Sequence, residues 1–155
     1  MLTLDAQIAS YVSSERELLY KHLEKVQKGD LLLLDRGYSS IALIFLLKAK
    51  DIQFCMRMKE NWWLNVKEFL ESGKAQHIVS FRLPKKDRNL LKDYPGMFEE
   101  QVKCRLVSVE LPNGENEILC TSLMDSQQYP VEDIAELYHY RWNEEEGYKL
   151  FKARM

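Results

Sequence analysis

The sequence predicts an α/β fold with a mostly antiparallel β section inserted before its last helix. Three observations support this prediction. The continuous aliphatic run at 31–34 is typical of a strand buried on both faces, as in a parallel sheet covered by helices. Strand and helix patterns alternate up to residue 58, which indicates an α/β arrangement. Beyond residue 60, strand patterns are joined by turn sequences, which indicates antiparallel hairpins.

The α/β part has clear start and stop signals. Ser14 and Glu17 form a capping box that begins a helix, and Gly29 ends it. Ser39 or Ser40 caps a second, strongly apolar helix. The predicted elements are a strand ending at residue 4, a helix over 14–29, a strand over 31–34, a helix over 41–50 and a strand over 52–58. Apolar and polar residues alternate in the last of these strands, so one of its faces is less buried.

Turn residues divide the rest of the chain. Gly73 ends a short helix, the stretch from Pro112 to Glu115 predicts a hairpin, and Pro130 suits the first position of the last helix. The predicted elements are a helix over 66–72, strands over 78–83, 102–111 and 117–123, and a long helix from about 130 through Lys152. The chain is thus predicted in three parts: an α/β core over 1–59, a β-rich insertion over 60–124, and the final helix within 125–155.

Composition and charge exclude several classes of protein. A length of 155 residues suits one domain with a real core. The net charge of −2 argues against a large, undifferentiated basic surface, so any DNA contact must come from local patches or from parts outside this sequence. Cys55, Cys104 and Cys120 are widely spaced in apolar runs, which predicts buried free thiols in a reducing cytoplasm. No signal peptide is visible, and the longest apolar run, 41–47, is too short to span a bilayer.

Asp35 is the first candidate site residue. It directly follows the predicted buried strand, and open α/β sheets place their chemistry at the carboxyl ends of strands. The alternative is a strand-end residue that only caps the following turn. Arg57 lies near the end of the next strand, where it either contacts phosphate or is a solvent-facing strand residue.

The last predicted helix carries the other candidates. On one continuous helix, Tyr138, Arg141, Glu145 and Lys152 fall within a stripe of roughly 60°. An acid, two cations and a phenol therefore project together. The alternative is an ordinary surface pair between Arg141 and Glu145, four residues apart, with snorkelling neighbours.

These residues match a known pattern. The spacing Tyr, two residues, Arg, three residues, Glu, six residues, Lys resembles the signature of the DDE transposases of bacterial insertion sequences, in the group named after those four residues. A second motif, Leu31 to Tyr38, resembles the strand and turn around the middle aspartate of that family. The resemblance covers nearly the whole chain, in order, and corresponds to the C-terminal part of the catalytic domain.

The resemblance implies an RNase H-like core that lacks its first strands. It also implies two-metal phosphoryl transfer, in which carboxylates hold two Mg²⁺ ions, replaceable by Mn²⁺. Asp35 and Glu145 match the second and third acids of the family. Tyr138, Arg141 and Lys152 match groups near the DNA backbone at the cut site, and the two cations suit phosphate oxygens.

The resemblance further implies double-stranded DNA with terminal inverted repeats as partner, a homodimer of the full-length protein, no membrane, and a cytoplasmic, nucleoid-associated location. No residue matches the first aspartate, because Asp5 leaves too little chain before Asp35 for the expected strands. We therefore expect little or no strand transfer by these residues alone. The alternative function is a non-catalytic remnant that binds DNA or a transposase subunit; a structure-specific nuclease is a weaker third option.

Overall fold

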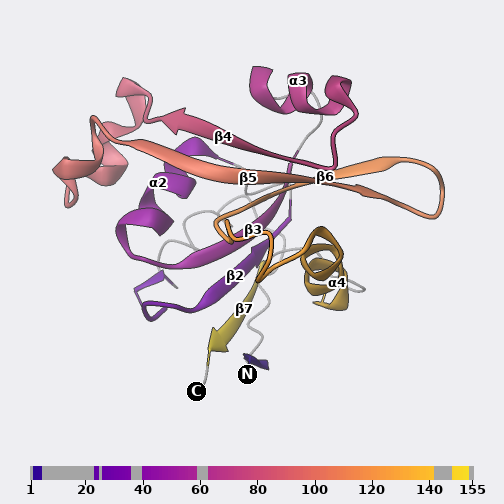
Figure 1. Ribbon diagram of the computed structural model, residues 1–155. Helices are drawn as coiled ribbons and strands as arrows, with labels where there is room; N and C mark the ends of the chain where they lie inside the picture. The colour runs from indigo at the N-terminus through magenta and orange to yellow at the C-terminus, as the bar shows by residue number, and fades with distance from the viewer. Residues whose placement is uncertain are drawn as a thin grey trace.

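The computed structural model describes residues 2–4, 23–24, 26–35, 40–58, 63–141 and 148–153, with the backbone alone at 2–4, 140–141 and 148–153. Within these residues, seven strands form one mixed sheet flanked by helices, which confirms the predicted α/β class (Figure 1). In order across the sheet, the strands are β1 (Leu2–Leu4), β7 (Tyr148–Ala153), β2 (Leu31–Leu34), β3 (Gln53–Met58), β6 (Asn116–Thr121), β5 (Gln101–Glu110) and β4 (Gln76–Arg82).

The α/β part of the sheet follows from the sequence as predicted. Strands β2 and β3 pair in parallel, and helix α2 (Ile41–Ala49) connects them. Ser40 is the N-cap of the helix: its backbone is extended, and its Oγ accepts the N–H of Leu43 at 3.3 Å. All four leucines of β2 are buried, as expected for a central strand.

The antiparallel part continues the same sheet. Strand β6 pairs with β3, β5 pairs with β6, and β4 pairs with β5, each antiparallel. Gly114, at φ +87°, turns the β5–β6 hairpin, and Gly73, at φ +70°, ends helix α3 (Leu64–Ser72). The segment between β4 and β5 contains two 3₁₀ helices, η2 (Lys85–Leu91) and η3 (Pro95–Met97).

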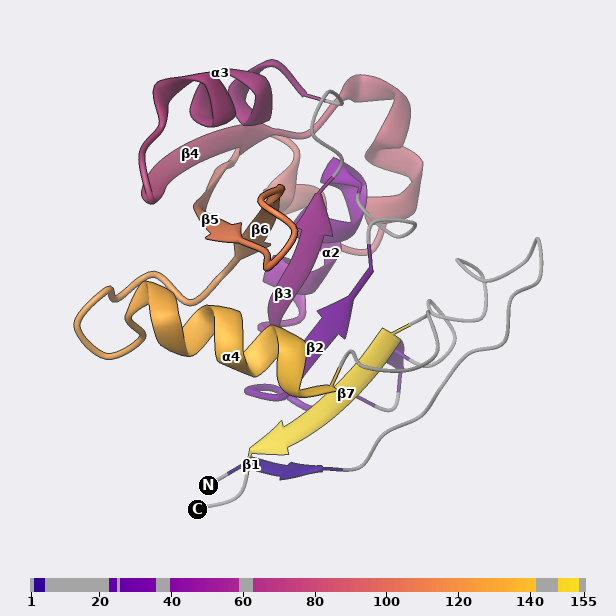
Figure 2. The same ribbon diagram turned by 90° about the vertical axis from the view of Figure 1, so that its right-hand side faces the viewer.

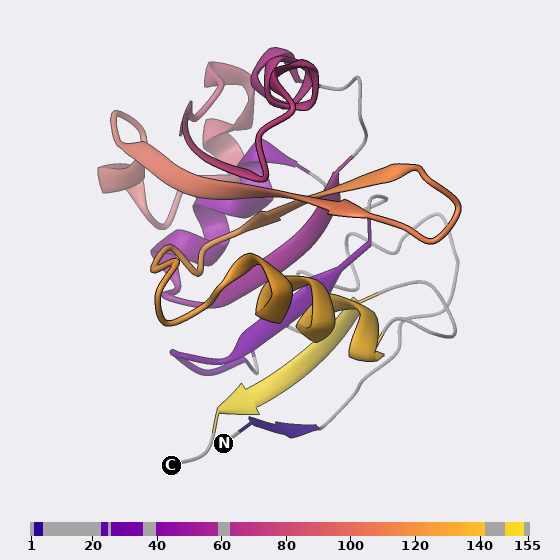
Figure 3. The ribbon, with the colours of Figure 1, turned by 45° about the vertical axis from the view of Figure 1, so that its right-hand side comes forward.

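Helices cover both faces of the sheet. One face of the central strands, including Leu32, Leu34 and Phe54, packs with α2 and η2. The opposite face, including Leu31 and Leu33, packs with helix α4 (Val131–Arg141). Figures 2 and 3 show α4 lying across the sheet on the side away from α2. Alternate residues of the four-leucine run thus serve two cores, because successive side chains of a strand point to opposite faces.

The prediction of one helix through Lys152 is wrong. Helix α4 ends at Arg141, and residues 148–153 form strand β7, antiparallel to both β2 and β1. The segment carries Tyr148 and Phe151, which favour strands, and Gly147, which weakens a helix by about 1 kcal/mol. Pairing with β7 also satisfies the backbone groups along the outer edge of β2, so tertiary pairing overrides the helical spacing.

Some predictions fall on residues outside the described ranges, including most of the helix over 14–29, and Glu145. Among the described helices, none combines the length and apolarity needed to cross a membrane.

Candidate active site

The candidate site lies at the carboxyl ends of the two parallel strands. Leu34 of β2 is opposite Met56 of β3, so Asp35 and Arg57 are the next residues on neighbouring strands. Asp35 is buried, at 9% exposure, while the Arg57 side chain keeps 31%. This is the edge at which open α/β sheets bind ligands.

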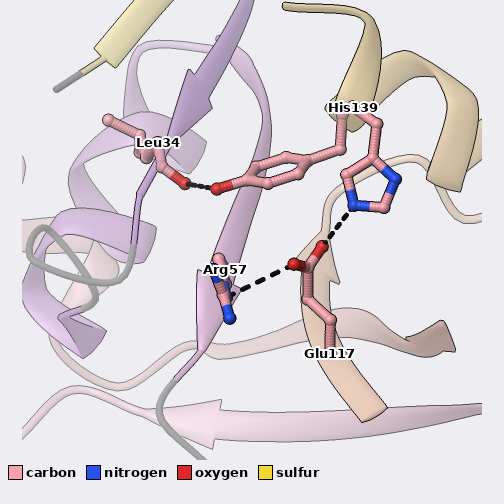
Figure 4. Close-up of polar contacts among 5 residues, drawn as sticks. Leu34, Arg57, Glu117 and His139 are labelled. Atoms are coloured by element: carbon pink, nitrogen blue, oxygen red, sulfur yellow. Dashed lines mark hydrogen bonds and ion pairs between the residues drawn. The ribbon is translucent and has the colours of Figure 1, made fainter. Parts of the chain in front are cut away.

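Tyr138 anchors α4 beside Asp35. Its side chain is fully buried, and its hydroxyl donates to the carbonyl oxygen of Leu34 at 3.0 Å (Figure 4). One helical turn earlier, Ile134 packs with the leucines of β2 on the same face. The helix is therefore fixed to the backbone position immediately before Asp35.

The pKa of the Tyr138 phenol is shifted by burial and by the ionisable groups around it. Burial raises the pKa of the Tyr138 phenol well above its usual range. The nearby acidic groups of Cys55, Glu117 and Asp35 raise this pKa further, and Arg57 opposes them. A neutral phenol surrounded by these groups can donate a hydrogen bond but will not act as a base near neutral pH.

Glu117 is the second buried acid of the site. It lies at the start of β6, with only 4% of its side chain exposed. Its Oε2 is 3.4 Å from Nε of Arg57, and its Oε1 is 2.9 Å from Nε2 of His139 on α4 (Figure 4). These contacts join β3, β6 and α4 at one point, and they compensate a carboxylate that burial would otherwise destabilise.

The structure brings together three of the predicted site residues: Asp35, Arg57 and Tyr138. Arg141 is the last residue of α4, three positions beyond Tyr138. Lys152 lies in β7, where its backbone is opposite Thr3, so it does not share a helical face with Tyr138. Glu145 is outside the described residues.

Sequence reasoning missed Glu117 and His139. Glu117 follows a polar hairpin, and no local pattern in the sequence shows that α4 covers it. His139 is adjacent to Tyr138, but its partner is 22 residues away in the sequence. The sequence signal that could have identified them is the position of an acid and a histidine beside otherwise apolar runs.

Replacing Tyr138 by phenylalanine is expected to lower the free energy of unfolding by about 1 kcal/mol, because the bond to Leu34 is lost inside the core. The raised pKa means that the unfolded phenol ionises first, so the wild type loses stability above about pH 10 and the variant loses less. Urea unfolding at neutral and alkaline pH measures both effects. Tyr94→Phe, at a half-buried position, serves as the control; equal losses in the two variants would contradict an anchoring role for Tyr138.

Comparison with known proteins identifies relatives of this chain. A family model described as "Transposase DDE domain" matches residues 1–155. The chain is similar to "Transposase InsG for insertion sequence element IS4" of Escherichia coli (strain K12), with 28% identity over 152 residues. That match covers 97% of this chain and 33% of the relative, so the chain spans about a third of the relative's length. No solved structure gives a significant match.

Proposed function

The chain belongs to the transposase DDE domain family, and from that premise we propose that it forms part of a catalytic domain that cuts and joins DNA at the ends of an insertion sequence. The family and the relative support DNA transposition in general. The two-metal mechanism, the RNase H-like identity of the core and the division at 1–59, 60–124 and 125–155 belong to this proposal.

One observation carries the proposal furthest: the hydroxyl of Tyr138 is bonded to the residue that precedes Asp35. The family signature begins at Tyr138, and its acid, Glu145, follows seven residues later in the sequence. Glu145 is four positions after Arg141, the end of α4, so their Cα atoms are at most about 14 Å apart. On its other side, Glu145 is three residues before Tyr148, whose backbone is opposite Leu34 on β2. This connectivity supports a shared site for Glu145 and Asp35.

The proposed metal ligands are Asp35 and Glu145. Carboxylate oxygens suit Mg²⁺, or Mn²⁺ in its place, and Asp35 supplies one at the end of β2. Among the described residues, no group of three or more His, Cys, Asp or Glu side chains is arranged to hold a metal ion. The described residues thus fit the ion through Asp35 alone. When bound, two such ions activate the attacking oxygen and stabilise the leaving one.

Contact with double-stranded DNA is assigned to Arg57, Arg141 and Lys152, whereas Tyr138, the fourth predicted DNA-binding residue, is too buried to make such a contact. The Arg57 guanidinium retains solvent exposure beside Asp35, where a phosphate would approach the site. Tyr138 is buried, so in this structure its hydroxyl supports the backbone at Asp35. Terminal inverted repeats as the target, a homodimer and a cytoplasmic location complete the proposal.

Metal binding tests the catalytic proposal. Mn²⁺ is expected to bind the wild-type chain. Its affinity is expected to fall tenfold or more in Asp35→Asn and in Glu145→Gln, because each variant removes a charged oxygen ligand. Calorimetry or electron paramagnetic resonance measures this. Asp30→Asn is the matched control, since Asp30 is also buried but precedes the same strand at its opposite end. Equal binding by all variants would contradict the shared metal site.

The second candidate is a non-catalytic remnant that binds DNA or a transposase subunit. The partly exposed side chain of Arg57 supports it, because an arginine can contact DNA phosphate without a metal ion. Retained DNA binding without Mn²⁺ binding would identify this alternative.

A further inference from the structure

The feature with the most unexplained chemistry is the buried carboxylate of Glu117. Its two oxygens contact Arg57 and His139, which come from two other elements of the fold. The side chains of Arg57 and His139 keep 31% and 42% exposure, whereas that of Glu117 keeps 4%. The acid therefore lies beneath two donors that both reach solvent.

We propose that Glu117 is a positioning residue, which holds Arg57 and His139 together as one phosphate-binding surface beside Asp35. This inference rests on the proposed function, because it assigns the surface to the DNA backbone. It adds a residue that lies outside the four-residue signature and that itself contacts no DNA.

The sheet register explains how Glu117 reaches Arg57. Arg57 is directly opposite Leu119, and Glu117 is two residues before Leu119 on β6. Residues in such a diagonal relation point to the same face, within reach of long side chains. That face is the one covered by α4, where Leu119 packs with Tyr138, so His139 approaches Glu117 from the helix.

The contact with Arg57 constrains the orientation of its guanidinium. Glu117 is close to Nε, which is nearest the aliphatic stem, so the planar group is held from beneath. A fixed guanidinium loses less conformational entropy when it binds phosphate. Stability alone does not require this arrangement, because apolar side chains of similar volume often replace a buried ion pair without loss.

The negative charge of Glu117 makes the expected direction of the change in DNA affinity informative. Removing a negative charge near DNA should by itself tighten binding, since phosphates are repelled by carboxylates. A positioning role predicts weaker binding after the same substitution. The two effects therefore oppose each other, so weaker binding by a variant that is still folded supports the positioning role.

The experiment measures binding of a fluorescein-labelled DNA duplex by anisotropy over a range of salt concentrations. Arg57→Ala is expected to weaken binding roughly tenfold and to reduce the salt slope by about 1. Glu117→Gln is expected to weaken binding roughly threefold to tenfold. The double variant is expected to lose less than the sum of the two single losses, because Glu117 acts partly through Arg57. Glu110→Gln, an exposed acid on β5, is the charge control and should bind slightly more tightly.

Three further measurements distinguish a lost positioning contact from a loss of folding. Thermal unfolding establishes that each variant is folded at the assay temperature, and Glu117→Asp, which shortens the acid but keeps its charge, should weaken binding as Glu117→Gln does. In nitrogen-15 spectra, the Arg57 Nε–H signal should exchange slowly with water in the wild type and rapidly in Glu117→Gln.

The outcomes separate this inference from the proposed function. If Arg57→Ala weakens binding but Glu117→Gln does not, or if their losses simply add, the positioning role is overturned and the DNA role of Arg57 stands. If Arg57→Ala leaves binding unchanged, or the wild type does not bind the duplex, the proposed DNA surface and the positioning role both fall. Weakening by Glu117→Gln, with a loss in the double variant that is smaller than the sum of the single losses, supports both.

Discussion

Replacing Arg105 by alanine is expected to lower the free energy of unfolding by about 3–5 kcal/mol. Arg105 is only 1% exposed, on the face of β5 that α4 covers. Its Nη1 donates to the carbonyl oxygens of Leu123 and Tyr129, at 3.2 and 2.6 Å, and its Nε donates to Oε1 of Gln76 at 2.8 Å. Alanine would leave these acceptors unpaired inside the protein and would create a cavity.

The loss of Arg105 should also affect helix α4, because of where its guanidinium lies. Leu123 and Tyr129 belong to the segment between β6 and α4, so the guanidinium fixes the approach of the helix that carries Tyr138. Burial lowers the pKa of Arg105 and Asp125 opposes this, yet a guanidinium stays charged at neutral pH. Such a loss is a large share of the 5–15 kcal/mol that typically stabilises a domain.

Chemical unfolding measures this prediction. Lys103→Ala is the control, because Lys103 is on the same strand but exposed, and it should change stability by no more than about 0.5 kcal/mol. Similar stability of the two variants would show that Arg105 does not hold the segment before α4.

The three cysteines are expected to react with a thiol reagent at least about a thousandfold more slowly in the native protein than in guanidinium. Cys55, Cys104 and Cys120 are all buried and free. Burial raises the pKa of Cys55, and contact with Cys104 together with burial raises that of Cys120. Because the thiolate is the reactive form, reaction must wait for opening, which costs at least about 5 kcal/mol for a stable domain.

Absorbance of the released chromophore follows this reaction. The exposed Ser80 on β4 provides the control, since Ser80→Cys adds one thiol that should react at the rate of the unfolded chain. Native cysteines that react as fast as that thiol would contradict their burial.

The elements that were predicted correctly are those whose signals are local. The four-leucine run, the Ser40 cap, the Gly73 stop and the hairpin at Gly114 each depend on side chains or backbone angles within a few residues. The final helix was mispredicted because its spacing suits one helical face, whereas its end is decided by pairing of β7 with β2. That pairing joins residues more than a hundred positions apart, which no local pattern reveals.

The same distinction holds for the site. Asp35 and Arg57 were predicted because strand ends can be found from the sequence, and Tyr138 because of its spacing. Glu117 and Arg105 were not predicted, since a charged residue in a strand normally faces solvent. Both are buried only because α4 and the segment before it fold over β5 and β6.

The pairing of β1 with β7 places Leu2 opposite Ala153. Neighbouring strands lie about 4.8 Å apart, so the two extremities of the described chain emerge together at one rim of the sheet. A linker of a few residues could join these two ends in a circular permutant. The new termini could then be placed at the exposed tip of the β5–β6 hairpin. A protein fused to Leu2 or to Ala153 would therefore be attached at the same edge of the sheet, at the end of the strand order away from the β5–β6 hairpin.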